Sequence, residues 1–214
     1  MTLTEKLLQA NNANREKIPN EFLEIMDAAT NDLKAKNLAE SALKVGDTIS
    51  NTTLPNAAGE EVALKNLWAK GPLVISFYRG GWCPYCNIEL KALQGSLSQF
   101  KELGANLVAI TPETPDNSLT TSEKNELSFS VLTDKDNVYA KELGLVIQLP
   151  EDLIAIYNQF GINVEKHNGN TDNELPMPAT FVVDTNGKVV YSFINEDYTK
   201  RGDVEDILTA LKAL

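Results

Sequence analysis

Two cysteines separated by two residues, Cys83 and Cys86, are the only cysteines in this chain of 214 residues. A structural disulfide normally joins segments that are distant in sequence, because closing a long loop removes more entropy from the unfolded chain. A Cys-x-x-Cys pair closes almost no loop. Its value must therefore be chemical, either reversible oxidation to a disulfide or coordination of a metal.

The residues around the pair indicate how it is positioned. A β-rich apolar run over 73–78 precedes it and apolar residues at helical spacing follow it, so we expect it where a buried strand meets a helix. A helix N-terminus favours a thiolate, and Pro84 suits the first helical turn. Arg79 either adds positive potential or is a solvated surface side chain. We assign Trp82 to packing at the rim.

Two other interpretations of the cysteines are weaker. A structural zinc site needs four ligands, and the two cysteines with the single histidine, His167, leave that set incomplete. Unreactive buried cysteines are common, but chance rarely places both at this spacing at such a junction. Redox chemistry without a metal or an organic cofactor is therefore the favoured interpretation.

Composition restricts the partners and the compartment. The net charge of -11 argues against binding to nucleic acids or to anionic membrane surfaces. The N-terminus has no apolar stretch typical of a signal peptide, and no later run is long enough to span a bilayer. We expect a cytoplasmic protein, in which thiols are kept reduced and a close cysteine pair cycles between redox states.

Periodicity divides the chain into two parts. Residues 1–43 carry apolar residues at spacings of three and four, which predicts a helical extension that is broken into two helices at Pro19. Its apolar stripe must pack either on the main domain or on a second copy of the chain, as in a homodimer.

Residues 44–214 alternate strands and helices, which predicts an α/β domain. The runs over 73–78 and 106–111 flank a helix that ends at Gly104, a βαβ unit with parallel strands. A further strand lies near 129–134 and a helix near 136–144. A hairpin with a two-residue Asn186-Gly187 turn follows, and then a final helix that Asp203 caps. Residues 112–120 and 165–176 are expected to be loops.

The segments VISFYRGGWCPYC, LVAITPE and MPATFVVDTNGKVVY resemble the alkyl hydroperoxide reductase and thiol-specific antioxidant family, the peroxiredoxins. They resemble most a branch of it that carries a thioredoxin-type Cys-x-x-Cys. The resemblance covers roughly residues 44–214. It implies a thioredoxin-like fold, with a central mixed β-sheet flanked by helices, and leaves residues 1–43 outside.

The resemblance also implies roles for individual residues. Typical peroxiredoxins carry Pro-x-x-x-Thr-x-x-Cys after this strand, which puts Arg79 at the proline, Cys83 at the threonine and Cys86 at the peroxidatic cysteine. Their distant arginine falls near Pro178, so the alignment leaves the pair without the usual polarising threonine and arginine. In the thioredoxin template Pro178 is instead a cis-proline that faces the disulfide, and we therefore predict a cis Met177–Pro178 bond.

We therefore expect a thiol oxidoreductase that reduces hydroperoxides or disulfides through a reversible Cys83–Cys86 disulfide and is recycled by a thioredoxin-type or glutathione-type reductant. The two templates disagree on the nucleophile: the thioredoxin template makes it Cys83 and the peroxiredoxin template makes it Cys86. Two alternatives remain open, a disulfide reductase without useful peroxidase activity and a non-enzymatic redox sensor or interaction module.

Overall fold

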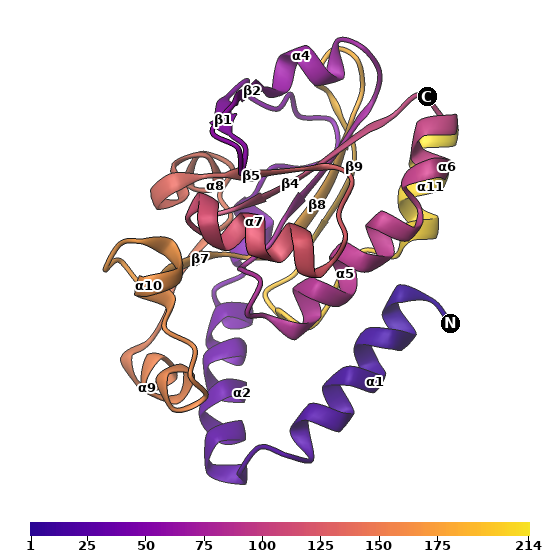
Figure 1. Ribbon diagram of the computed structural model, residues 1–214. Helices are drawn as coiled ribbons and strands as arrows, with labels where there is room; N and C mark the ends of the chain where they lie inside the picture. Colours follow the sequence, from indigo (N-terminus) through magenta and orange to yellow (C-terminus); the bar gives the residue numbers. More distant parts are fainter.

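The computed structural model describes all 214 residues, and its centre is a five-stranded mixed sheet in the order β5-β4-β3-β8-β9 (Figure 1). Strand β3 pairs in parallel with β4, and β4 with β5, whereas β8 and β9 run antiparallel. The sheet confirms the predicted α/β, thioredoxin-like fold class. Its strands are β3 (Leu73–Phe77), β4 (Asn106–Thr111), β5 (Ser130–Thr133), β8 (Ala179–Val183) and β9 (Val189–Ile194).

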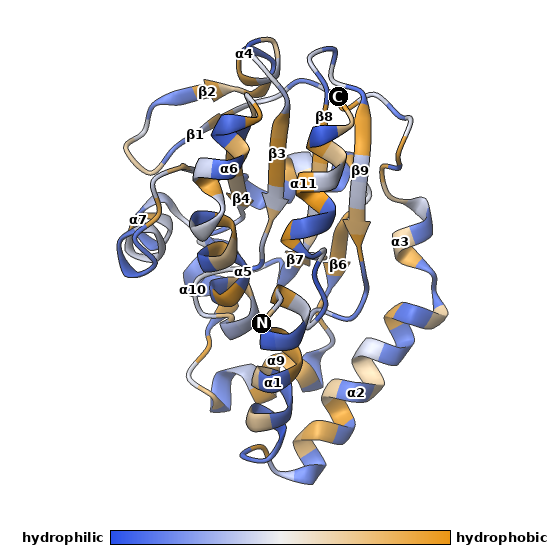
Figure 2. Ribbon diagram, turned by 90° about the vertical axis from the view of Figure 1, so that its right-hand side faces the viewer, coloured by the Kyte–Doolittle hydropathy of each residue, from blue (hydrophilic) through white to orange (hydrophobic).

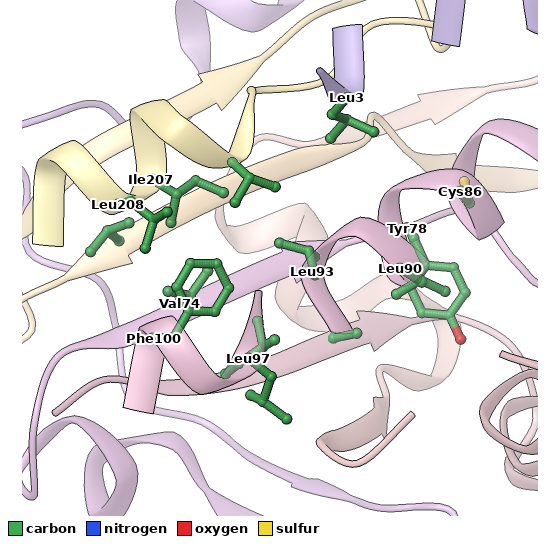
Figure 3. Packing of buried hydrophobic residues seen from close by; sticks show 14 of the residues in the cluster. Leu3, Val74, Tyr78, Cys86, Leu90, Leu93, Leu97, Phe100, Ile207 and Leu208 are labelled. Atoms are coloured by element: carbon green, nitrogen blue, oxygen red, sulfur yellow. The ribbon is translucent and has the colours of Figure 1, made fainter. Parts of the chain in front are cut away.

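Both faces of the sheet are covered, which explains why β3 is apolar along nearly its whole length. Val74 points into one hydrophobic cluster and Ile75 into another on the opposite face, because successive side chains of a strand alternate. Figure 2 shows the central strands coloured mainly as hydrophobic. Cys86 belongs to the first cluster, so the cysteine pair lies at the end of a buried layer (Figure 3).

The helices of the first cluster are α5 (Pro84–Gly95), α6 (Leu97–Glu102) and α11 (Val204–Lys212). The sequence predicted one helix up to Gly104, but Ser96 leaves the helical region, with φ -107° and ψ 5°, and separates α5 from α6. The apolar face predicted for α11 is buried. Asp203 stands at the N-cap of α11, yet its carboxylate accepts the backbone N–H of Thr4 and forms no capping bond.

Two predicted loops contain regular structure. Residues 112–120 lead into α7 (Pro115–Lys124), and residues 165–176 include most of α10 (Val164–Asn168) and the strand β7 (Glu174–Pro176). Helix α7 buries Ser118 and Thr121 rather than large apolar residues. Hydrophobic periodicity therefore could not reveal it.

The hairpin turn is longer than predicted. The N–H of Asp184 donates to the carbonyl of Lys188 at 2.9 Å, so three residues intervene, and Gly187 adopts a left-handed φ of 81°. Glycine adopts this conformation at no steric cost. The Asn-Gly pair therefore predicted the position of the turn correctly, but it did not predict the length of the turn.

Shorter elements complete the domain around the main sheet. Strand β6 pairs antiparallel with β7, and β1 pairs antiparallel with β2. These elements are β1 (Thr53–Pro55), β2 (Glu61–Ala63), α4 (Leu64–Trp68), the 3-10 helix η1 (Lys135–Asn137), α8 (Val138–Glu142), β6 (Val146–Gln148) and α9 (Glu151–Gln159).

The N-terminal segment forms α1 (Leu3–Arg15), α2 (Asn20–Ala35) and α3 (Leu38–Ser41), and the break lies at Pro19 as predicted. Helices α1 and α2 form a V at the end of the molecule opposite α4 (Figure 1). Leu3 and Leu7 of α1 join the cluster that contains α5, so this part of the stripe packs on the chain's own domain. None of the helices combines the length and the apolar character needed to cross a bilayer.

The packing of α1 is testable by truncating Leu7, which is 4% exposed, against its neighbour Leu8, which is 53% exposed. We expect Leu7→Ala to lower the free energy of unfolding by about 2–5 kcal/mol, because it leaves a cavity in the core. Urea denaturation should show almost no change for Leu8→Ala. Equal effects of the two variants would mean that α1 does not pack on the domain.

Candidate active site

The cysteine pair lies at the junction of a buried strand and a helix, as expected from the sequence: β3 ends at Phe77 and α5 begins at Pro84. Cys83 is the N-cap residue of α5, and Cys86 lies in its first turn. Both are free thiols, and Cys83 is 1% exposed and Cys86 0%. The side-chain amide of Asn87 donates to the carbonyls of Gly81 at 2.8 Å and Cys83 at 3.0 Å. The turn that carries Cys83 is therefore held in one conformation.

Arg79 is a buried part of this site, with only 3% exposure, so its interpretation as a solvated surface residue is wrong. Its guanidinium donates to the hydroxyl of Tyr157 at 2.5 Å. The guanidinium carbon lies 5.0 Å from the ring centre of Trp82, 5.5 Å from that of Tyr157 and 4.6 Å from that of Tyr198. It forms no ion pair with a carboxylate. Aromatic rings, not acids, therefore stabilise this buried cation.

A second guanidinium, that of Arg201, reaches the pair and was missed from the sequence. Its Nη2 donates to Sγ of Cys86 at 3.2 Å, and its Nε donates to Glu89. The Glu89 carboxylate also accepts the hydroxyl of Thr180 at 3.1 Å. The alignment put the distant arginine near Pro178 and thus left the pair without one, whereas the fold supplies one from the loop before α11.

Only a weak signal for Arg201 exists in the sequence. The chain has three arginines, and two of them, Arg79 and Arg201, are buried at the cysteine pair. Arginine is preferred for buried ionic contacts because its planar guanidinium keeps its charge and offers several donors. Because arginine is rare in this chain, both residues could have been singled out from the sequence. Their distances from the sulfur atoms could not have been predicted.

These surroundings separate the pKa values of the two thiols. Burial opposes ionisation of Cys83, but a hydrogen bond from Cys86 and the charges of Arg79 and Arg201 outweigh it and lower the pKa of Cys83 to about 6. Burial raises the pKa of Cys86 well above its ordinary value, and the neighbouring Cys83 thiolate raises it further. These shifts favour ionisation of Cys83 before Cys86.

Cys83 lines a cavity of about 330 Å³, whereas Cys86 does not. Three of the four supporting residues named from the sequence, Arg79, Trp82 and Pro84, line this cavity with Cys83. The wall of Arg79, Tyr157 and Tyr198 is shared with a second cavity of about 470 Å³.

Pro178 lines the second cavity, whose lining does not include Cys83, and the prediction of a cis Met177–Pro178 bond is wrong because the structure contains no cis peptide bond. The N–H of Met177 donates to the carbonyl of Leu145 at 2.8 Å, and the chain runs on from β7 into β8. This continuous path suits the trans form, which an X–Pro bond favours by about 0.5–1 kcal/mol.

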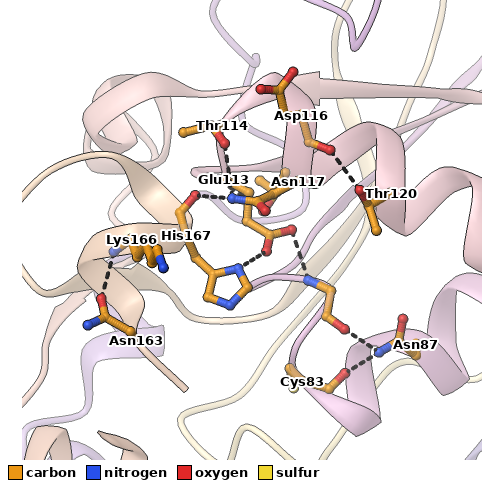
Figure 4. Close-up of polar contacts among 12 residues, drawn as sticks. Cys83, Asn87, Glu113, Thr114, Asp116, Asn117, Thr120, Asn163, Lys166 and His167 are labelled. Carbon is orange, nitrogen blue, oxygen red and sulfur yellow. Dashed lines mark hydrogen bonds and ion pairs between the residues drawn. The ribbon is translucent and has the colours of Figure 1, made fainter. Parts of the chain in front are cut away.

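A polar network supports the other side of the cysteine turn (Figure 4). The buried carboxylate of Glu113 accepts the N–H of Gly81 at 2.9 Å and lies 3.0 Å from Nδ1 of His167. His167, which the sequence offered as a zinc ligand, therefore contacts a carboxylate rather than the cysteines. No cluster of three or more histidine, cysteine or acidic residues is arranged to hold a metal ion.

Comparison with known proteins gives consistent matches. The AhpC/TSA family matches residues 45–192. The chloroplastic peroxiredoxin Q of Sedum lineare is 28% identical over 179 residues, which cover 84% of this chain and 83% of the relative. Peroxiredoxin Bcp of Escherichia coli is 25% identical over 170 residues, which cover 79% of this chain and 96% of the relative.

Solved structures show the same fold. Peroxidoxin BcpB from Mycobacterium tuberculosis superposes with a TM-score of 0.64 at 23% identity and covers 80% of this chain and 98% of its own. A reduced peroxiredoxin from Vibrio vulnificus in complex with hydrogen peroxide gives a TM-score of 0.62 at 19% identity, with coverages of 79% and 99%. At these identities the likeness establishes the fold, and the chemistry must come from the residues of this chain.

The thiolate on Cys83 can be tested by alkylation as a function of pH in a Cys86→Ser background, in which only Cys83 reacts. We expect the rate with iodoacetamide to reach half its maximum near pH 6. Arg79→Gln should move this midpoint upward, because it removes a positive charge beside the sulfur. Lys70→Gln, an exposed change after α4, is the control. A midpoint at the ordinary cysteine value would contradict the assignment.

The ionic contact of Arg201 with Glu89 can be tested by unfolding. Arg201→Met leaves a buried carboxylate without a cation and should cost about 3–5 kcal/mol of stability. Adding Glu89→Gln should restore part of that loss, because a neutral amide can still bond Thr180 without carrying a buried charge. If the single and double variants unfold at the same urea concentration, the contact is not energetically coupled.

Proposed function

This chain is a member of the AhpC/TSA family, and we propose that it is a cysteine-based thiol peroxidase in which Cys83 attacks the hydroperoxide and Cys86 resolves the product. One observation carries the assignment of roles. Cys83 has the lowered pKa and also lines the cavity, whereas Cys86 has a raised pKa and lies outside it. A nucleophile must be both ionised and reachable.

The first step oxidises Cys83. Its thiolate attacks the terminal oxygen of the hydroperoxide, the O–O bond breaks, and Cys83 becomes a sulfenic acid. The leaving alkoxide takes from solvent a proton equivalent to the one that Cys83 released when it ionised. Two electrons pass from sulfur to the peroxide, and the products are the sulfenic acid and an alcohol, or water when the substrate is hydrogen peroxide.

The second step forms the disulfide. The sulfur of Cys86 attacks the sulfenic sulfur of Cys83, and the hydroxyl group leaves with the Cys86 proton as water. Arg201 donates to Sγ of Cys86 and thereby favours the thiolate that this attack requires. Because the two cysteines already lie within one helical turn, no large rearrangement is needed.

Arg79 supplies the polarising group that the alignment found missing at the threonine position. Its Nε has no hydrogen-bond partner, and its guanidinium borders the cavity beside Cys83. A hydrogen bond to the leaving oxygen stabilises the charge that develops there, and such oriented donors contribute factors of about 10² or more to a rate.

The disulfide reductase alternative rested on the thioredoxin-type Cys-x-x-Cys, on the missing threonine and arginine, and on Pro178 as a cis-proline that faces the pair. The peptide bond before Pro178 is trans, and Pro178 lines the other cavity. The choice of Cys83 as the nucleophile agrees with the thioredoxin template, but Arg79 and Arg201 supply the cations that the alignment left missing, which removes the objection to peroxide reduction.

The roles of the two cysteines can be separated by single substitutions. With one equivalent of hydrogen peroxide, Cys86→Ser should form a stable sulfenic acid on Cys83, which dimedone traps and mass spectrometry locates. Cys83→Ser should consume peroxide at least 100-fold more slowly, because the remaining thiol is protonated at neutral pH and lies outside the cavity. Dimedone on Cys86 of Cys83→Ser at the wild-type rate would reverse the assignment.

A further inference from the structure

The cavity over Cys83 has one wall that precedes the family match at 45–192. Helix α1, helix α2 and their connection form this wall, and α5, α9, the residues after α9 and the loop before α11 form the rest. The lining residues from the N-terminal segment are Asn14, Lys17, Ile18 and Met26. Cys83 itself is 1% exposed. A molecule too large for the cavity can therefore reach Cys83 only if part of the wall moves.

A protein reductant is such a molecule. The peroxidase cycle ends with a Cys83–Cys86 disulfide that must be reduced again, and the sequence led us to expect a thioredoxin-type reductant. Thiol–disulfide exchange passes through a mixed disulfide, in which the two sulfur atoms lie about 2.05 Å apart. A folded protein docks through a surface patch of about 800 Å², whereas the cavity measures about 330 Å³. Reduction by a protein dithiol therefore requires an open form of this site.

Helix α2 is the loosely packed part of the wall. None of its 16 residues is buried, whereas α1 buries Leu3 and Leu7. A cavity of about 470 Å³ lies between α2 and the domain, bordered by Ala29 and Leu33 on one side and Leu149 on the other. Side chains that border a cavity lose packing contacts on that side. Segments with few buried apolar contacts open at a lower free energy than the core does.

Three side-chain pairs tie α2 to other segments, besides its apolar contacts with α9 and the neighbouring loops (Figure 1). They are the edge-on rings of Phe22 and Phe160 at 5.8 Å, the two hydrogen bonds from Arg15 to Asp27 at 2.7 and 2.8 Å, and the ion pair of Lys34 with Asp197 at 3.4 Å. The four charged side chains are 21–49% exposed. Ion pairs this exposed contribute little to stability, so α2 is held closed only weakly.

The segments on either side of α2 are anchored more firmly. Before it, α1 is tied to the cysteine helix by the hydroxyl of Tyr85, which donates to Asn11 at 3.0 Å. After it, Asn37 adopts a left-handed φ of 49°, and the N–H of Ala39 donates to the carboxylate of Glu196 at 2.9 Å. Residues 16–37 are therefore a strap between two fixed points, and α2 can be displaced while both points stay attached.

We propose that α2 is a gate over the disulfide, which moves away from α9 to admit a thioredoxin-type protein dithiol to Cys83. The Phe22–Phe160 and Arg15–Asp27 contacts return it to the closed position. The peroxide reacts in the closed form, in which the Cys83 thiolate and the guanidinium of Arg79 stay out of water, and the protein reductant reacts in the open form. The proposal rests on the peroxidase function proposed above and adds how its disulfide is reached.

The reduction balances with one dithiol. Its first thiolate attacks Sγ of Cys83, the Cys83–Cys86 bond breaks, and Cys86 leaves as a thiolate that Arg201 contacts and then takes up a proton. The second thiol of the reductant loses its proton to solvent and attacks the first, which releases the Cys83 thiolate. Two electrons enter this protein, and the reductant leaves as an internal disulfide.

The test compares how fast thioredoxin and dithiothreitol, a small dithiol, reduce the disulfide form of the full chain in stopped flow. The disulfide is prepared with diamide, so the measurement does not depend on peroxide reduction. The thioredoxin rate constant is proportional to the open fraction, and the double variant Phe22→Ala/Asp27→Ala should raise it roughly threefold or more. The dithiothreitol constant should stay nearly unchanged, because a small dithiol enters the closed cavity.

Glu174→Ala is the matched control. It also removes one negative charge and breaks an ion pair, that of Glu174 with Lys141 at 2.6 Å, but neither residue lines the cavity over Cys83 or belongs to α2. Both rate constants should remain at the wild-type values in this variant. A gain with thioredoxin as large as that of the double variant would show that charge, not access, changed the rate.

A variant that tightens α2 should have the opposite effect. Ala29 borders the 470 Å³ cavity, whose lining does not include Cys83, so Ala29→Leu fills space beneath α2 without entering the cavity over the sulfur. We expect reduction by thioredoxin to slow roughly threefold or more, and reduction by dithiothreitol to keep its rate. Hydrogen exchange of the α2 amides should become slower in Ala29→Leu and faster in Phe22→Ala/Asp27→Ala.

Several results would overturn the gate. One is a thioredoxin rate constant that does not follow the exchange of α2 across these variants, and another is unaltered exchange in all of them. Wild-type α2 amides that exchange as slowly as those of the central sheet would also contradict it, as would a disulfide that only dithiothreitol reduces. Peroxide consumption with dithiothreitol is measured in parallel, and its absence would refute the peroxidase function while the diamide experiment still decides the gate.

Discussion

The interaction on which this site depends is the attraction between a buried thiolate and two buried guanidinium groups. Removing a cation from water is costly, and Glu89 compensates that cost for Arg201. No acid does the same for Arg79, which is held among aromatic rings, and the Cys83 thiolate is the anion of its immediate surroundings. In a medium of low dielectric constant such charges interact far more strongly than in water. The same interaction thus lowers the pKa of the Cys83 thiol and stabilises the buried, charged guanidinium of Arg79.

This interaction requires the rest of the fold to bury the charged groups and to hold the cysteine turn in a fixed position. The charges must be kept largely out of water, and both arginines and both cysteines are at most 4% exposed; α1 and α2 contact α5 and the end of α9 beside them. The cysteine turn must also keep its position relative to both arginines. The sheet end at β3, the amide of Asn87 and the carboxylate of Glu113 hold it there.

The site therefore combines features of two templates. The fold and the family match are those of peroxiredoxins, while a cysteine occupies the position at which the alignment expects a threonine. Two buried guanidinium groups are nevertheless present at the pair, and they come from other points of the chain, one directly after β3 and one before α11. The cations beside the sulfur atoms are thus brought there by the folding of the chain and not by a local sequence motif.

Local signals in the sequence determined a good part of this protein. The apolar run of β3, the Asn-Gly turn and the inner face of α11 depend on nearby residues, so their periodicity and turn chemistry predicted them. The position of the cysteine pair at a strand-to-helix junction followed in the same way. Helix α7 escaped prediction because its buried face is polar, and only its neighbours in space show that this face is inside.

The tertiary structure alone decided the contacts between distant segments. Arg201 lies 115 residues from Cys86 along the chain, and Asn11 lies 74 residues from Tyr85, so no spacing rule connects them. The trans bond before Pro178 and the burial of Arg79 likewise depend on how β7, α9 and the N-terminal helices pack. A sequence specifies which side chains can do chemistry through their types and local spacing, whereas distances, burial and charge compensation arise only when the packed chain excludes water.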